Sequence, residues 1–254
     1  MSQRGRTIDA GDLRLAVREW DGPGQPVILV HGLGLGSRAW DRVVPRLRTR
    51  GLRVVVYDQR GHGRSESAAA YTPAAFATDL AAVVDGLGLV RPLLVGHSLG
   101  ALVALDHAAA RGDCAGVVAV DGGVPATLPA LDWAALEGAR RSPLLRLMER
   151  AMRLAGVGTA LSLAEQRAVV TAYEAKAAGL EDLYGRVACP IMLVMGARAD
   201  TVPNGAAIRA ALHAGVRRAQ AARPDIQVEW LPCGHNVPLE RPAELADLVG
   251  RFAT

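Results

Sequence analysis

The chain has 254 residues, of which 50% are hydrophobic, 21% are charged and 4% are aromatic. This composition excludes a disordered or collagen-like chain, and so few aromatic side chains argue against a platform that stacks nucleic-acid bases. The net charge of +4 comes almost entirely from arginines spread along the sequence rather than from a basic stripe, so we expect no nucleic-acid partner.

The first predicted elements are a hairpin and then a series of buried strands. Leu13, Leu15 and Val17 alternate with the residues between them after a turn at 9–12, which predicts a hairpin with one solvated face. Six short apolar runs follow, and each is typical of a strand in a sheet that is covered on both faces. These runs are 27–30, 52–56, 92–95, 117–120, 190–195 and 226–231.

Helical patterns lie between these runs. Apolar residues recur at helical spacing in 40–47 and in 76–87, and the second stretch has Thr72 as its expected N-cap and Pro73 in its first turn. Strands that alternate with helices predict an α/β fold, a doubly wound and mostly parallel sheet with helices on both faces.

One stretch interrupts the alternation. Between 124 and 186 only helical periodicity is present. We therefore divide the chain into a core, residues 1–123 and 187–254, and a helical insertion, residues 124–186. An insertion that leaves the carboxyl edge of a parallel sheet would cover the place where ligands bind in such folds, so it is interpreted as a lid.

The motif G-x-S-x-G occupies 96–100, directly after the run 92–95 and directly before a helical stretch. Strand, motif and helix in this order are the context of a nucleophile elbow, a sharp turn that presents its serine. The free N–H groups of the following helix would stabilise negative charge there. Ser98 is therefore the predicted nucleophile.

A serine nucleophile needs a base, and His235 is the candidate among six histidines. It lies in a loop just past the last predicted strand, at the same sheet edge as Ser98. The other histidines lie in glycine turns, in the elbow or in predicted helices; they are His31, His62, His97, His107 and His213.

Two aspartates stand just beyond strand ends, and either could orient the imidazole of His235. Asp121 follows the run 117–120 directly, whereas four residues separate Asp200 from the run 190–195. We prefer Asp200, because the longer loop can turn back toward His235. Asp121 remains the alternative, and it would otherwise cap the entry to the insertion.

A glycine-rich loop at 31–36 supplies the remaining part of the predicted site. A tetrahedral intermediate needs two N–H donors, and we expect the backbone N–H groups of Leu99 and Leu33. The loop could instead bind phosphate, but it lacks the G-x-G-x-x-G order and the lysine of a P-loop. We therefore expect no nucleotide, metal or other cofactor.

Other features bear on disulfides, membranes and location. Cys114, Cys189 and Cys233 are odd in number and have no C-x-x-C spacing, so they predict neither a disulfide framework nor a zinc site. The longest apolar stretch, 93–105, is too short for a spanning helix, and the first 15 residues lack the apolar segment of a signal peptide. The sequence thus predicts a cytoplasmic protein without a membrane partner.

Five segments in order resemble the α/β-hydrolase superfamily, in particular its lid-bearing serine hydrolases. They span nearly the whole chain and are 31–34, 58–65, 96–100, 196–200 and 234–235. The resemblance implies an eight-stranded sheet, a structural turn at 58–65, the triad Ser98, Asp200 and His235, and oxyanion donors at Leu33 and Leu99. A serine at the elbow disfavours the dehalogenase and epoxide hydrolase branches, which use a carboxylate there. The single Leu33 after His31-Gly32 resembles carboxylesterases, enol-lactonases, C–C hydrolases and cofactor-free haloperoxidases.

These residues predict a hydrolase of small-molecule esters, lactones or thioesters. Ser98 would attack the carbonyl, His235 would carry the proton, and water would then hydrolyse the acyl-enzyme. Two alternatives remain open: a C–C bond hydrolase or lyase that uses the same triad, and a non-catalytic scaffold that binds a ligand.

Overall fold

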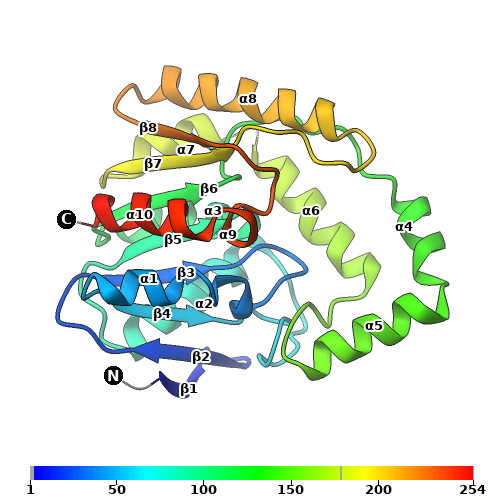
Figure 1. Cartoon of the computed structure of the whole chain (residues 1–254), viewed down its shortest axis with the longest axis horizontal. Helices are drawn as coiled ribbons and strands as arrows, with labels where there is room; N and C mark the ends of the chain where they lie inside the picture. The colour runs from blue at the N-terminus through cyan, green and yellow to red at the C-terminus, as the bar shows by residue number, and fades with distance from the viewer. Residues whose placement is uncertain (1–2, 178, 254) are drawn as a thin grey trace.

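The structure is a computed structural model that describes residues 3–177 and 179–253. Its eight strands form one sheet in the order β1-β2-β4-β3-β5-β6-β7-β8 (Figure 1). The strands are β1 (Gln3–Asp9), β2 (Arg14–Trp20), β3 (Pro26–Val30), β4 (Arg53–Tyr57), β5 (Leu93–His97), β6 (Gly116–Val120), β7 (Ile191–Gly196) and β8 (Gln227–Leu231). β2 is antiparallel to both β1 and β4, and every other neighbouring pair is parallel. The α/β-hydrolase fold predicted for the chain is confirmed.

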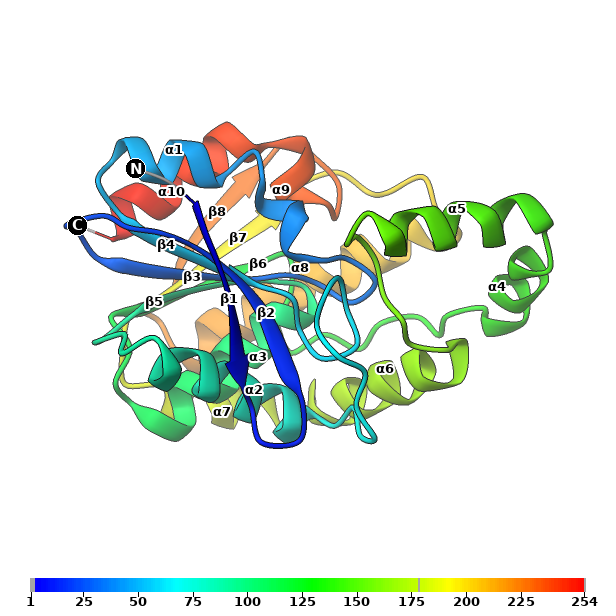
Figure 2. The same ribbon diagram turned by 90° about the horizontal axis from the view of Figure 1, so that it is seen from below.

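Two layers of helices cover the sheet (Figure 2). One layer has the short η1 (Ser37–Trp40), α1 (Val44–Thr49), α9 (Val237–Glu240) and α10 (Pro242–Phe252). The other has α2 (Pro73–Gly86), α3 (Leu99–Arg111), α7 (Leu180–Arg186) and α8 (Gly205–Ala222). The N-cap predicted for α2 is present, since the hydroxyl of Thr72 accepts a hydrogen bond from the N–H of Ala75.

The central strands are apolar along their whole length because both of their faces are buried. In β3, Ile28 and Val30 pack under one helical layer, whereas Val27 and Leu29 pack under the other, and all four are 0% exposed. Successive side chains of a strand point to opposite faces, so a strand covered twice needs an unbroken apolar run. β8 departs from this prediction: it is largely exposed, because it is the edge strand and pairs with β7 alone.

The helices between β6 and β7 do not all lie against the sheet. α4 (Trp133–Arg140) and α5 (Pro143–Leu154) project away from it, and α6 (Leu163–Ala177) leads back (Figures 1 and 2). α4 has no buried residue, whereas α7 packs against α3 and α8 in the helical layer of the core. The assignment of 124–186 as a lid stays a prediction. No helix in the described ranges is long and apolar enough to cross a membrane.

Two histidines hold the turn at 58–65 to the glycine-rich loop at 31–36: His31 in the loop and His62 in the turn. His31 donates from Nδ1 to the carbonyl of Gly32 and accepts at Nε2 from the N–H of Gln59. His62 donates from Nδ1 to the carbonyl of Arg60 and accepts at Nε2 from the N–H of Gly34. Each ring therefore uses one nitrogen as donor and the other as acceptor, which requires the neutral imidazole.

This arrangement predicts that the fold loses stability in mild acid. Burial lowers the pKa of His31 to about 4 and that of His62 to about 3. Below the ordinary pKa of about 6.5, the unfolded chain binds protons that the folded chain does not, so stability falls as the pH falls. We expect the free energy of unfolding to drop between pH 7 and pH 5, by up to about 1.4 kcal/mol per pH unit for each histidine.

Denaturant titrations at pH 7, 6 and 5 measure this free energy directly. Recovery of the original midpoint after return to pH 7 serves as the control against irreversible damage. A midpoint that does not change between pH 7 and pH 5 would contradict the assignment of both rings as neutral structural groups.

Candidate active site

Ser98 lies at the turn between β5 and α3, where its backbone is strained. Its φ of 52° and ψ of −113° are unusual for a residue with a side chain. The turn closes tightly, because a Cβ on Gly96 would lie 2.1 Å from the carbonyl oxygen of Gly100, and a Cβ on Gly100 would lie 2.3 Å from that of Val30. The elbow thus explains both glycines of the motif, and it presents Ser98 to a cavity.

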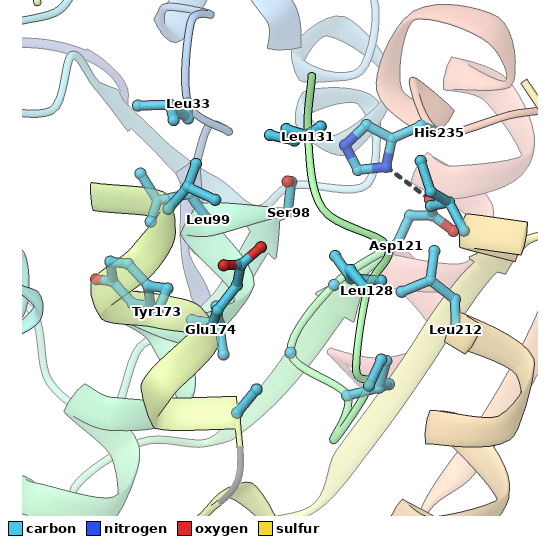
Figure 3. A pocket seen from close by; sticks show the side chains of 18 of the residues that line it. Leu33, Ser98, Leu99, Asp121, Leu128, Leu131, Tyr173, Glu174, Leu212 and His235 are labelled. Atoms are coloured by element: carbon cyan, nitrogen blue, oxygen red, sulfur yellow. Dashed lines mark hydrogen bonds and ion pairs between the residues drawn. The ribbon is translucent and has the colours of Figure 1, made fainter. Parts of the chain in front are cut away.

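The imidazole of His235 faces the same cavity from the loop after β8 (Figure 3). Its Nδ1 lies 2.7 Å from Oδ2 of Asp121, which follows β6 directly. The side chain of Asp121 is fully buried, whereas that of His235 is 39% exposed. Within the described part of the chain, the hydroxyl of Ser98 makes no hydrogen bond to the imidazole.

The carboxylate of Asp121 is held by four hydrogen bonds from three residues. Oδ1 accepts from the N–H of Gly196 at 2.8 Å and from Nη1 of Arg209 at 2.6 Å, while Oδ2 accepts from Nη2 of Arg209 at 3.2 Å and from His235. Burial alone would raise the pKa of Asp121, but the hydrogen bonds from His235 and Arg209 outweigh it and lower the pKa. Asp121 is therefore a fixed, ionised acceptor for the ring.

The structure contradicts the preference for Asp200 as the acid. Both oxygens of Asp200 face the backbone N–H of His235, at 2.9 and 3.2 Å, rather than its ring. The loop after β7 does turn back toward His235, as its length allowed, but it meets the main chain at Gly234 and His235. Asp121, the alternative, contacts the imidazole instead. It directly follows β6, which lies two strands from β8 in the sheet, and its backbone is left-handed, with a φ of 44°.

The backbone of His235 is held at two points. Asp200 accepts its N–H, and Nε2 of His97 donates to its carbonyl oxygen at 2.9 Å. Burial lowers the pKa of His97 to about 3, so this ring stays neutral and serves as a support. The sequence placed His97 in the elbow but gave no sign of this contact.

Arg209 is the other site residue that the sequence did not reveal. It belongs to α8, is 5% exposed, and also lies 3.6 Å from Oδ2 of Asp200, so one guanidinium joins both aspartates. The sequence does contain an indication of its role, because Arg209 lies on the same helical stripe as the buried Leu212, Val216 and Ala219. A charged residue in a buried stripe requires a partner.

Leu33 and Leu99, the predicted oxyanion donors, belong to two different segments that border the cavity. Both residues line the cavity beside Ser98, and Leu99 is the first residue of α3. Within the described residues, the backbone N–H of neither has a hydrogen-bond partner. Unpaired N–H groups at a helix start are suited to a negatively charged oxygen.

The cavity itself has a volume of about 420 Å³ and is mostly apolar. Aliphatic side chains form its walls, among them Leu102, Val124, Leu128, Val170, Ile208 and Leu212. It draws on α3, on the segment after β6, on α6 and on α8. A volume of this size and walls of this kind are typical of small-molecule sites.

A possible metal-binding cluster lies apart from this cavity. Ligand atoms of His107, Asp113 and Cys114 are within 4.8 Å of one another. However, burial raises the pKa of the Cys114 thiol to about 12, and the guanidinium of Arg111 lies 3.3 Å from Asp113. A protonated thiol and an adjacent cation oppose metal binding, so we assign no metal there.

Comparison with known proteins adds to this geometry. Residues 27–248 match a family model described as "Alpha/beta hydrolase family". A crystal structure from Burkholderia cenocepacia, described as a "putative aryl esterase", aligns with 98% of this chain and 97% of that one, at a TM-score of 0.76 and 28% identity.

Curated relatives match a shorter part. Epoxide hydrolase A of Mycobacterium tuberculosis is 38% identical over 102 residues, which are 39% of this chain and 32% of that protein. Non-heme haloperoxidase of Rhodococcus erythropolis is 43% identical over 84 residues, 33% of this chain and 30% of that protein. The matched part is thus about a third of the length of these relatives.

Proposed function

The chain belongs to the alpha/beta hydrolase family, and from this premise we propose that it is a serine hydrolase that cleaves a small-molecule ester, lactone or thioester. The observation that carries the proposal is the 2.7 Å contact between Nδ1 of His235 and the buried carboxylate of Asp121, beside a strained Ser98 in the same cavity. A buried carboxylate that holds one imidazole tautomer leaves Nε2 free to take a proton from a serine.

The proposed reaction proceeds in two steps. Oγ of Ser98 attacks the substrate carbonyl while Nε2 of His235 accepts its proton, and the N–H groups of Leu33 and Leu99 bind the oxyanion. His235 then protonates the leaving group. In the second step, His235 removes a proton from water, which attacks the acyl carbon; the bond to Oγ then breaks, the acid product leaves, and His235 returns the proton to Oγ of Ser98. The hydrogen bond between Ser98 and His235 forms when substrate fills the cavity, as catalytic contacts often tighten in the complex.

A fluorophosphonate probe and a series of p-nitrophenyl esters of increasing chain length test the proposal. We expect covalent labelling at Ser98 and ester hydrolysis that disappears after labelling. A protein that neither reacts with the probe nor hydrolyses any ester, lactone or thioester in the series would contradict it and would favour a ligand-binding scaffold.

Arg209→Met is expected to alter both stability and pH dependence. It removes the cation beside Asp121, so the free energy of unfolding should fall by about 3–5 kcal/mol, the usual cost of breaking a buried pair. The freed carboxylate would stabilise the imidazolium of His235 more strongly. The acid limb of the pH profile of kcat/KM should therefore move to higher pH.

The matched control is Arg209→Lys, which keeps a positive charge and should leave the acid limb closer to that of the parent. Profiles are recorded on samples whose folded state is verified by circular dichroism. An acid limb that does not move in Arg209→Met would mean that Arg209 stabilises the fold without acting on the base.

A further inference from the structure

The cavity contains a carboxylate that the proposed mechanism does not use, that of Glu174 in α6. Figure 3 shows its side chain directed into the cavity, on the side of α6 that faces Ser98. Across the described ranges, Glu174 has no hydrogen bond and no ion pair. Its neighbour Lys176 is engaged elsewhere, since its ammonium lies 2.6 Å from Asp106 of α3.

The packing of α6 fixes Glu174 on the cavity side of the helix. Val170, Glu174 and Ala177 are spaced by four and three residues and all line the cavity, so they form one stripe. The neighbouring stripe has the buried Val169 and Tyr173, which pack into the core. Glu174 is therefore exposed to solvent and also lines the cavity, where it is the polar member of an otherwise apolar stripe.

The described cavity lining does not provide a positive charge that would neutralise the carboxylate of Glu174. Its described lining has the carboxylates of Asp121, Glu174 and Asp200 and the guanidinium of Arg209. Arg209 is bound to Asp121 and lies beside Asp200, so it is already shared by two anions. Three carboxylates against one guanidinium and one imidazole give the described lining an excess of negative charge.

This excess has a consequence for an enzyme that forms an oxyanion at Ser98. The carboxylate of Glu174, which has no partner among the described residues, repels the negative charge that develops on a neutral substrate in the same cavity. Because Glu174 is exposed, this repulsion is weakened by salt. A positive charge on the substrate would cancel that repulsion and would also find a partner in Glu174.

We propose that Glu174 binds a cationic nitrogen of the substrate, so that the substrates are esters or thioesters whose acyl or alcohol part carries an ammonium group. This inference rests on the proposed hydrolase function. The aliphatic side chains around Glu174, such as Leu99 and Val170, contact the methylene groups between the carbonyl and the nitrogen. Anionic substrates are disfavoured by the same charge.

Two pairs of esters, each matched in shape and different in charge, test the inference. The first pair places the charge in the acyl part: the p-nitrophenyl esters of 4-(trimethylammonio)butanoate and of 5,5-dimethylhexanoate. The second places it in the alcohol part: butyrylcholine and 3,3-dimethylbutyl butyrate. We expect kcat/KM of the cationic member to exceed that of the neutral member by at least about tenfold in one of the pairs, and the excess to shrink at high salt.

Glu174→Gln is expected to remove the preference for the cationic ester by changing kcat/KM for both members of the pair. It should lower kcat/KM for the cationic ester about tenfold and raise it somewhat for the neutral one, because the repulsion of the oxyanion is gone. Glu137→Gln is the matched control: it removes one carboxylate from the exposed α4, outside the cavity lining, and should retain the preference.

The outcomes separate this inference from the proposed function. Hydrolysis of the neutral esters that depends on Ser98, with no preference for the cation in either pair or with a preference that Glu174→Gln retains, would overturn the role of Glu174 and leave the hydrolase intact. Absence of hydrolysis that depends on Ser98 for all four esters and for the p-nitrophenyl series would overturn both.

Discussion

Ser98→Ala is expected to lower kcat by a factor of about 10⁴–10⁶, the scale observed when the nucleophile of a triad is removed. The loss is this large because the remaining polar groups in the described cavity lining are poor substitutes for the serine: they are carboxylates, an imidazole, a guanidinium, an amide and the phenol of Tyr173, whose pKa is raised by burial. The measurement is kcat and KM on the best ester of the p-nitrophenyl series.

The same variant should remain folded. The strained backbone at residue 98 is imposed by the closure of the turn, and alanine occupies less space than serine, so the free energy of unfolding should change by less than about 0.5 kcal/mol. A folded Ser98→Ala protein that retains more than a tenth of kcat would eliminate Ser98 as the nucleophile.

Asp121→Asn is the second change with a large expected effect, a loss of about 10⁴ in kcat. An amide at this position can present its NH₂ to Nδ1 of His235, which favours the wrong tautomer and removes the charge that stabilises the imidazolium. Asp200→Asn should cost tenfold or less, because Asp200 contacts the backbone N–H of His235 and an amide oxygen can still accept that bond.

The two aspartate variants are compared by kcat at a pH where the parent is most active, and their folded fractions are checked first. This check is needed because Asp121→Asn weakens the pair with the buried Arg209. If Asp200→Asn loses as much activity as Asp121→Asn, or more, the assignment of the acid from geometry is wrong and the preference drawn from loop length is right.

The fold could be predicted from the sequence because its main signals are local. A strand buried on both faces needs an unbroken apolar run, and the runs at 27–30 and 92–95 overlap β3 and β5. β8 was less predictable in its burial, because the composition of a strand does not say whether it will have one neighbour or two.

The candidate site was harder to predict, because its contacts depend on where each side chain points rather than on the spacing of residues in the sequence. Sequence distance indicated that a loop could bring Asp200 to His235, and the loop does so, but only coordinates show that the carboxylate meets the backbone instead of the ring. Asp121 reaches the ring through a left-handed backbone conformation, which residues other than glycine adopt rarely and which no local pattern announced. Arg209 lies near the start of α8 and joins Asp200, in the loop just before this helix, to Asp121, which is far away in the sequence.

The position of β8 at the edge of the sheet has a consequence for local stability. The loop after this strand supplies His235, and the strand pairs with β7 alone. Because a segment with one pairing partner and an exposed surface opens more readily than the buried centre of a sheet, His235 is expected to leave the site before the elbow and Asp121 are disturbed. Ester turnover should then be lost at a lower denaturant concentration than the bulk circular dichroism signal.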